Sequence, residues 1–219
     1  EQVINVRVED KLAALRATLS DHAHESALVF ANMKASIADI EKALTQVGVS
    51  VASLHGDLEQ RDRDAVLARF RNGSVRVLVA TDVAARGIDV DHLDLVVNFD
   101  LPPKPENYVH RIGRTGRAGK RGVAVSFAGP REQPKLDAIE ELTGQKLTRV
   151  PFVPGVRGDA ESQPLSREAK MATLKIGGGR KQKVRPGDIR CALTGEAGGL
   201  SGDDVGKIEI HDNFAYVAV

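Results

Sequence analysis

The chain has 219 residues, enough to bury a substantial core in one or two domains. It is 42% hydrophobic and 28% charged, which is typical of a soluble globular protein, and no apolar run approaches the roughly 20 residues of a membrane-spanning helix. The formal net charge of +1 neither favours nor excludes nucleic acid as a partner.

Short apolar runs alternate with longer amphipathic stretches over residues 1–149. The runs that predict strands are Ala27–Phe30, Val51–Leu54, Val75–Val79, Leu95–Phe99 and Val123–Phe127. The stretches that predict helices are Lys11–Ser20, Met33–Val47, Leu58–Arg71, Pro105–Ile112 and Arg131–Thr143. This alternation predicts an α/β fold in which helices cover both faces of a parallel sheet and ligands bind where the strands end.

A second, smaller unit is predicted after a linker. Residues 150–169 are rich in Pro and Gly and are assigned to the linker. Within residues 170–219, the pattern predicts a strand, a helix and a hairpin: Thr173–Ile176, Pro186–Leu193, and Val205–Ile210 with Phe214–Val219. This order is short of the further helix and strand that close a common α/β sandwich, so we expect a truncated or disordered C-terminal end. Cys191 lies in the apolar helical stretch and is predicted to be in the core.

The stretch from His110 to Lys120 carries a Gly at every third position, and a cation follows each one. Glycine allows close approach of the backbone to a ligand, and arginine presents a fork that matches phosphate oxygens. Tyr108 and Ile112 share the inner face of the preceding helix, so Arg114 and Arg117 are expected in a loop that points away from the core. Two such cations can neutralise a phosphoryl group during transfer. On charge alone, a solvated basic loop is an equally good interpretation.

Polar residues also follow the predicted strand Val75–Val79. Thr81 can hold a phosphate oxygen. Asp82 and Asp89 can each cap a helix, bind a ribose hydroxyl or position an arginine.

The segment from His55 to Arg63 opens a predicted helix. Asp57, followed three residues later by Gln60, resembles a capping box. That interpretation does not account for the pair Gln60 and Arg63, which share a helix face at i and i+3.

Four segments together resemble the motifs of a known family. Ala27–Phe30, His55-Gly56 with Gln60-x-x-Arg63, Ala80–Asp89 and His110–Arg117 look like motifs IV, QxxR, V and VI of DEAD-box RNA helicases. They cover residues 1–148, which resemble the second RecA-like domain of that family. His110 favours the RNA helicases, because relatives that act on DNA commonly carry Gln there.

The resemblance implies a role for each matching residue. Arg114 and Arg117 are implied to be arginine fingers on the γ-phosphate of ATP, and His110 to couple the nucleotide site to a partner domain. Further implied nucleotide contacts are Gly87 and Asp89. The implied contacts to the RNA backbone are Gly56, Arg63 and Thr81.

The family's first RecA-like domain, with its Walker A lysine and Asp-Glu-Ala-Asp carboxylates, has no counterpart in the chain. ATP with Mg²⁺ is the implied cofactor. The Mg²⁺ ligands are expected in that N-terminal domain of the same protein, and no metal site is expected here. The chain alone is therefore expected to be inactive as an ATPase.

The tail resembles the RNA-binding domain of DbpA-type helicases, an RRM-like module. The match rests on Met171–Leu174, Gly177–Lys181, Arg185–Ile189, Ala192–Glu196 and Val205–Ile208. Asp212, Asn213 and Val219 replace residues that are normally basic, Gly and aromatic in an RRM, so we do not expect bases to stack on its sheet. A basic loop is the expected RNA contact, with a solvated loop as the alternative: Arg180, Lys181, Lys183 and Arg185.

We therefore predict the C-terminal part of an ATP-dependent RNA helicase that unwinds short RNA duplexes. The resemblance points to 23S ribosomal RNA and to ribosome assembly. A non-catalytic RNA-binding fragment and a DNA helicase of the same superfamily are the alternatives. The chain begins with neither Met nor a signal peptide and has one cysteine, so we expect a piece of a longer, cytoplasmic protein without a membrane anchor. Its oligomeric state stays open.

Overall fold

The computed structural model describes the chain except for residues 23–24, 87–89, 91–92, 117–121, 153–168 and 197. The chain divides into two compact units. The first comprises Glu1–Leu58 and Arg76–Glu168, and the second comprises Glu59–Val75 and Ala169–Val219. The linker boundaries expected from the sequence stay a prediction.

The first unit contains a seven-stranded sheet, and all neighbouring strands in its described part are parallel. In their order across the sheet, the strands are β3 (Val51–Leu54), β4 (Val77–Ala80), β2 (Ala27–Phe30), β5 (Leu95–Asn98), β6 (Val123–Ala128), β1 (Gln2–Asn5) and β7 (Thr148–Pro151). Every residue of β2, β4 and β5 is buried, as expected of strands that are covered on both faces. The predicted parallel α/β fold is confirmed.

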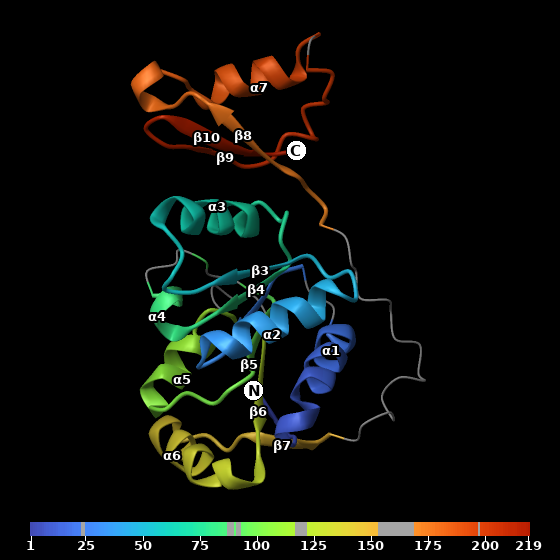
Figure 1. The fold of residues 1–219 in the computed structure, drawn as a ribbon, viewed down its shortest axis with the longest axis vertical. Helices are drawn as coiled ribbons and strands as arrows, with labels where there is room; N and C mark the ends of the chain where they lie inside the picture. Colours follow the sequence, from blue (N-terminus) through green and yellow to red (C-terminus); the bar gives the residue numbers. More distant parts are fainter. Residues whose placement is uncertain (23–24, 87–89, 91–92, 117–121, 153–168, 197) are drawn as a thin grey trace. The chain divides into compact units, whose positions relative to one another are not determined.

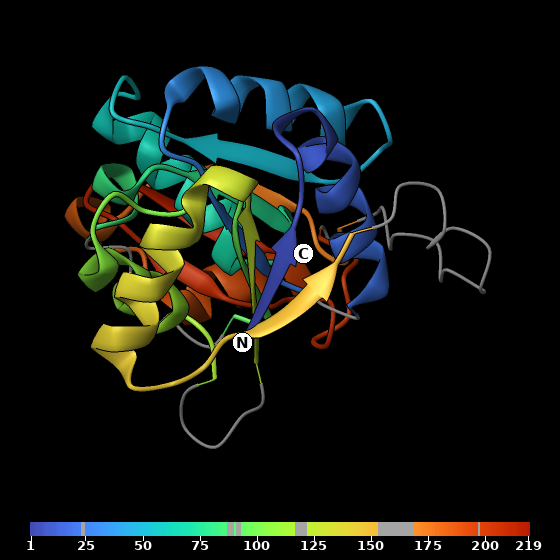
Figure 2. The ribbon, with the colours of Figure 1, turned by 90° about the horizontal axis from the view of Figure 1, so that it is seen from below.

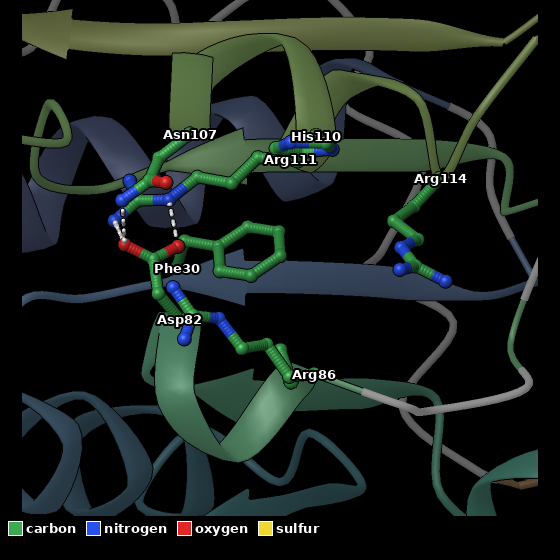
Figure 3. Close-up of a pocket in the computed structure, with 8 residues that line it drawn as sticks. Phe30, Asp82, Arg86, Asn107, His110, Arg111 and Arg114 are labelled. Carbon is green, nitrogen blue, oxygen red and sulfur yellow. Dashed lines mark hydrogen bonds and ion pairs between the residues drawn. The ribbon is translucent and has the colours of Figure 1, made fainter. Parts of the chain in front are cut away.

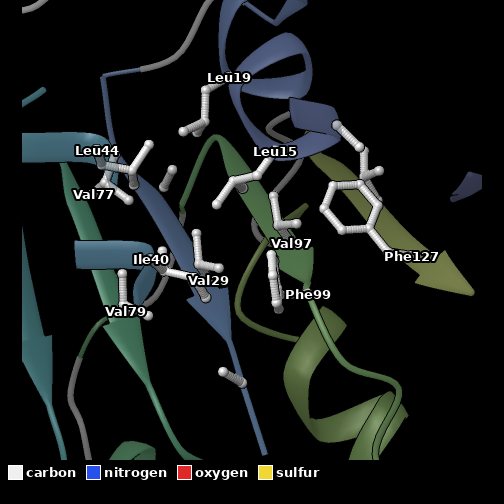
Figure 4. Close-up of a cluster of buried hydrophobic side chains, with 14 of the residues drawn as sticks. Leu15, Leu19, Val29, Ile40, Leu44, Val77, Val79, Val97, Phe99 and Phe127 are labelled. Atoms are coloured by element: carbon white, nitrogen blue, oxygen red, sulfur yellow. The ribbon is translucent and has the colours of Figure 1, made fainter. Parts of the chain in front are cut away.

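Helices lie on both faces of this sheet (Figures 1 and 2). They are α1 (Lys11–Asp21), α2 (Lys34–Thr45), α5 (Pro105–Ile112) and α6 (Gln133–Thr143). On one face, Leu15 of α1 and Ile40 of α2 pack with Val29 of β2 in a buried apolar cluster (Figure 4). On the other face, Tyr108 of α5 and Leu136 of α6 form a second cluster.

Two strands at one edge of the sheet have no clear signal in the sequence. β1 lies between β6 and β7 and is parallel to both, with Val3 paired to Ser126 and to Arg149. In β7 only Val150 is partly buried, and the other residues are exposed. Neither strand shows the long apolar run or the alternation on which a prediction depends.

The second unit contains α3 (Gln60–Arg71), β8 (Thr173–Gly177), a 3₁₀ turn η3 (Arg180–Gln182), α7 (Pro186–Thr194), β9 (Ile208–Ile210) and β10 (Phe214–Ala218). The strands form an antiparallel sheet in the order β8-β10-β9. Ile189 of α7 packs against Ala215 and Val217 of β10. Within residues 170–219, the predicted order of a strand, a helix and a C-terminal hairpin is confirmed.

Cys191 does not lie in the core, so that prediction is wrong. Its side chain is exposed, whereas Ile189 and Leu193 of the same helix pack on the small sheet. An α-helix turns by roughly 200° over two residues, so a side chain two positions after Ile189 points to solvent. Over the described residues, no helix combines the length and the apolarity needed to cross a membrane.

Candidate functional site

The carboxyl ends of β2, β4 and β5 meet at one edge of the parallel sheet. Phe30, the last residue of β2, is paired with Ala80 of β4 and with Asn98 of β5. A cavity of about 350 Å³ opens at this edge, beside the short helix α4 (Asp82–Ala85) and α5 (Figure 3). Its lining residues are Phe30, Asp82, Ala85, Arg86, Asn107, His110, Arg111 and Arg114. The cavity therefore lies where parallel sheets bind ligands.

Arg111 is the centre of a buried polar network at this edge. Its side chain is 2% exposed, and it donates to Asp82 through Nε (Oδ1, 2.6 Å) and Nη2 (Oδ2, 2.9 Å). Nη2 also donates to Asn32 Oδ1 at 2.8 Å, and Nη1 donates to Asn98 Oδ1 at 3.1 Å and to the carbonyl oxygen of Asp100 at 2.7 Å. One guanidinium thus joins α5 to α4 and to the segments in which β2 and β5 end.

The sequence pattern gives no direct indication of this role for Arg111. An arginine in the last turn of a helix is ordinarily explained by favourable interaction with the helix dipole at the surface. The available signal is its spacing, because Arg111 lies three residues after the buried Tyr108 and thus shares its helix face. The cation also lies over an aromatic ring, with Arg111 Cζ 4.9 Å from the centroid of Phe30.

Asp82 positions an arginine and does not cap a helix. The N-cap of α4 is Thr81, whose Oγ1 accepts a hydrogen bond from Ala84 N at 3.3 Å. Asn107 Nδ2 donates to Asp82 Oδ2 at 3.5 Å, so α5 contacts the carboxylate through two residues. Among the interpretations of Asp82, the pairing with an arginine is confirmed.

His110 and Arg114 both line the cavity, and their roles stay predictions. Leu93 N donates to the carbonyl oxygen of Arg114 at 3.0 Å, and the hydroxyl of Thr115 donates to the carbonyl oxygen of Leu93. Gly122 lies close to Thr115. A Cβ at Gly122 would lie 1.8 Å from Thr115 Oγ1, so only glycine fits at this position. Three further predicted nucleotide-site residues lie outside the described residues: Gly87, Asp89 and Arg117.

The charge of the cavity lining suits a polyphosphate. Among the described residues that line the cavity are three arginines and one carboxylate, Asp82, which is paired with Arg111. Arginines therefore outnumber carboxylates in the described lining, and arginine forks suit the oxygens of a phosphate. Across the described part of the chain, no group of three or more His, Cys, Asp and Glu is placed to hold a metal ion.

Two of the predicted RNA contacts follow neighbouring strands. Leu54 of β3 pairs with Ala80 of β4, so Gly56 and Thr81 leave the sheet at the same edge. A Cβ at Gly56 would meet no atom within 4 Å, so the space beside its Cα is open. Arg63 lies in the first turn of α3, in the second compact unit. The RNA roles of these residues stay predictions.

The interpretation of Asp57 and Gln60 as a capping box is wrong. The N-cap of α3 is Glu59, and it forms no side-chain capping hydrogen bond. Asp57 instead pairs with Lys34, and this hydrogen bond and charge lower the pKa of the Asp57 carboxyl. Gln60 Nε2 donates to Asp64 Oδ1 at 2.7 Å, one turn further along the helix.

The backbone of the basic loop in the tail is hydrogen-bonded to the β9–β10 hairpin. Arg180 N donates to the carbonyl oxygen of His211, and Lys181 N to that of Asp212, both at 2.9 Å. A Cβ at Gly179 would lie 2.1 Å from the carbonyl oxygen of His211, so the loop approaches the β9–β10 hairpin too closely for any other residue. The side chains of all four predicted RNA contacts are exposed: Arg180, Lys181, Lys183 and Arg185.

The comparisons with known proteins agree with this geometry. The helicase conserved C-terminal domain matches residues 10–119, and the DbpA RNA binding domain matches residues 173–219. The chain is 50% identical to the ATP-dependent RNA helicase DbpA of Escherichia coli (strain K12), over 100% of this chain and 46% of that protein. It is 36% identical to DbpA of Bacillus subtilis (strain 168), over 99% of this chain and 48% of that protein. The chain thus spans about half the length of the curated relatives it matches.

A solved structure shows the same fold over the first part of the chain. The C-terminal domain of the DEAD-box protein Dbp5 superimposes with a TM-score of 0.65 and 36% sequence identity, over 69% of this chain and 89% of that one. The family matches, the parallel sheet and the cavity at its carboxyl edge lead to one assignment. The chain belongs to the DEAD-box RNA helicases, with their C-terminal helicase domain followed by a DbpA-type RNA-binding domain.

Proposed function

We propose that the chain is the C-terminal part of an ATP-dependent RNA helicase that unwinds short RNA duplexes. The observation that carries the proposal is the placement of His110 and Arg114 in one cavity with the buried Arg111–Asp82 pair. This cavity lies at the carboxyl edge of the parallel sheet, and arginines outnumber carboxylates among the described residues that line it. The names of the two bacterial relatives support the same activity.

In this proposal Arg114 and Arg117 neutralise the negative charge that develops on the γ-phosphate. ATP, when bound, supplies the phosphoanhydride bond whose hydrolysis drives the helicase cycle. Gly87 and Asp89 hold the nucleotide, and His110 couples the cavity to a partner domain. Arg111 acts as a positioning residue, because its hydrogen bonds to Asp82 hold α5 against α4.

The other half of the nucleotide site is proposed to come from an N-terminal RecA-like domain of the same protein. That domain supplies the phosphate-binding lysine and the carboxylates that hold Mg²⁺. Two observations support this division: the sequence contains no Gly-x-x-x-x-Gly-Lys-Ser/Thr loop, and the chain covers 46% of its E. coli relative.

RNA is proposed to bind in two places. Its backbone runs along Gly56, Thr81 and Arg63, while the tail loop from Arg180 to Arg185 holds a structured RNA, the 23S ribosomal RNA, during ribosome assembly in the cytoplasm. The exposed cations of the loop and the match to the DbpA RNA binding domain support the second site.

ATP hydrolysis by the full-length protein tests the role of Arg114. Arg114→Ala should lower the RNA-stimulated kcat by roughly 10³-fold or more, because an arginine finger contributes about 10³–10⁵ in rate. Arg131→Ala is the control, since it removes the same charge from an exposed residue of the 3₁₀ turn η2 (Pro130–Glu132). Equal turnover by the two variants would contradict the proposal.

Two comparisons address the alternatives. The 219-residue chain alone should show no RNA-stimulated ATP hydrolysis, and appreciable turnover would contradict the division of the nucleotide site between two domains. RNA should stimulate the full-length enzyme more than DNA of the same sequence. Equal stimulation would favour a DNA helicase.

A further inference from the structure

The small sheet has one face that is not covered by α7. Val217 of β10 packs toward α7, so its neighbour Tyr216 points to the opposite face. In the sheet register, Tyr216 is paired with Lys175 of β8 on one side and with Glu209 of β9 on the other. These three residues therefore form a row across the sheet, on the face away from α7.

Aromatic rings gather on this second face. The rings of His211 and Phe214 stack at 4.6 Å, and Phe214 meets Tyr216 edge to face at 5.2 Å. Lys175 Nζ lies 4.7 Å from the centroid of Phe214 and 5.9 Å from that of Tyr216. Even so, Tyr216 is only 3% exposed. A face that buries a tyrosine this completely is covered by another element of the unit.

That element is α3, which belongs to the same compact unit as the small sheet. Arg71, its last residue, donates to both carboxylate oxygens of Glu209, through Nε at 2.8 Å and through Nη2 at 2.6 Å. Such a bidentate ion pair is strong and geometrically specific. Burial would raise the pKa of Glu209, but hydrogen bonds from Arg71 and Lys207 outweigh it and hold this pKa below its usual range.

Further contacts extend along the same face. Asn72 and Ser74, which follow α3, both form hydrogen bonds with Thr173 Oγ1, at 3.4 and 2.5 Å. Thr173 lies two residues before Lys175 in β8 and thus on the same face. Burial, and after it the negative charge of Asp64 on α3, raise the pKa of the Tyr216 hydroxyl. The C-terminal end of α3 and the residues that follow it therefore contact this face.

We propose that this face of the small sheet is the docking surface of α3 and not a platform for stacked RNA bases. The Arg71–Glu209 ion pair stabilises the contact between α3 and this face. The RNA contacts of the tail are made by the loop from Arg180 to Arg185. Docking also ties the RNA-binding tail to the helix that carries Arg63. That last consequence rests on the proposed function, whereas the docking itself does not.

Disulfide formation tests the docking. In a Cys191→Ser background, Ser74→Cys with Thr173→Cys replaces two hydroxyls that are in contact by two thiols. This pair should cross-link rapidly under mild oxidation, as measured by the loss of free thiol and by mass spectrometry. The control pair, Ser74→Cys with Lys181→Cys, places the second thiol on the exposed loop and should cross-link far more slowly. Equal rates for the two pairs would overturn the docking.

Charge reversal tests whether the Arg71–Glu209 ion pair stabilises the docking. Arg71→Glu and Glu209→Arg should each slow the Ser74–Thr173 cross-link roughly tenfold, the effect of losing charge-assisted hydrogen bonds, and the double reversal should restore it. Arg69→Glu, an exposed position on the same helix, makes the same charge change and should leave the rate unaltered. Two results would contradict this role of the ion pair: equal cross-linking rates for Arg71→Glu and Arg69→Glu, or no recovery of the rate in the double reversal.

RNA distinguishes docking from base stacking. A fluorescent RNA duplex with a single-stranded tail, at a concentration that saturates the chain, should leave the cross-linking rate unchanged. A rate that falls as this RNA saturates would show that bases compete with α3 for the face, and would overturn the proposal. These measurements involve no ATP, so their failure is distinct from a failure of the proposed helicase activity.

Discussion

Arg111 is the residue on which the cavity most depends. Arg111→Ala would leave the Asp82 carboxylate and the buried Asn98 amide without their shared partner, which should lower the free energy of unfolding by about 3–5 kcal/mol. Arg111→Lys keeps the charge but loses the planar fork, so it should recover only part of this loss. Urea unfolding of the chain, followed by circular dichroism, measures both effects.

His110→Ala is the matched control for this prediction. His110 precedes Arg111 on α5, but its side chain is exposed. We expect the control to change the free energy of unfolding by less than about 0.5 kcal/mol. If Arg111→Ala unfolded at the same urea concentration as His110→Ala, the buried network would not stabilise the fold.

Residues differ in how far the sequence determines their role. The sequence predicts His110 and Arg114 at the nucleotide site because their motif is local, and both residues line one cavity. It does not predict the role of Arg111, because its partners Asn32 and Asp82 lie 79 and 29 residues away in the chain. Only the topology of the sheet brings such partners to one edge.

At the scale of elements, Glu140 holds the connection from α6 to β7. Its carboxylate accepts hydrogen bonds from Lys146 Nζ at 2.8 Å, Leu147 N at 3.1 Å and Arg149 Nη2 at 3.2 Å. These bonds, that from Lys146 above all, lower the pKa of Glu140 to about 2, from an ordinary value of 4.5. Between these pH values the unfolded chain binds a proton that the folded chain does not, so stability falls as the pH decreases through this range.

We expect Glu140→Gln to weaken this pH dependence. Urea midpoints at about pH 6 and about pH 3 should differ less in the variant than in the unmodified chain, because the proton-linked contribution is gone. Glu141→Gln removes a neighbouring carboxylate that is exposed, and it should leave the difference unchanged. A variant of Glu140 that kept the full pH dependence would assign the acid sensitivity to other carboxylates.

Elements with their own sequence signal were predicted well, and the others were not. Pro105–Ile112 is confirmed as α5 at both ends, since Pro at its start and Gly after its end mark the boundaries. β7 carries no apolar alternation and exists because β1 offers it a parallel partner. In the same way, the sequence predicts the helix α7 but not which of its faces is buried. For this reason the predicted position of Cys191 is wrong.

At the scale of the whole molecule, long-range pairs assign segments to units in ways that local patterns do not reveal. Arg71 and Glu209 are 138 residues apart and occur in segments that the sequence assigns to different domains. Contacts of this kind place α3 in one compact unit with the tail. Neither the helical pattern of α3 nor the strand pattern of β9 predicts the other as its partner.

The charge of the whole chain is nearly balanced, yet its distribution is uneven. Between Arg167 and Arg190, eight basic residues stand against two acidic ones, although the net charge of the chain is only +1. A cation that neutralises a phosphate of single-stranded RNA contributes about 0.7 to the slope of log affinity against log salt concentration. Lys181→Ala with Lys183→Ala should therefore weaken RNA binding and flatten this slope by up to about 1.4.

Fluorescence anisotropy of a labelled RNA, from about 50 to about 300 mM KCl, measures that slope. Lys42→Ala with Lys135→Ala is the matched control, because it removes the same charge from exposed positions on α2 and α6. If net charge alone attracted the RNA, both double variants would flatten the slope equally, and the tail loop would be removed from the interface. If the loop contacts phosphates, only the first variant flattens the slope, because only a cation that neutralises a phosphate displaces a counterion.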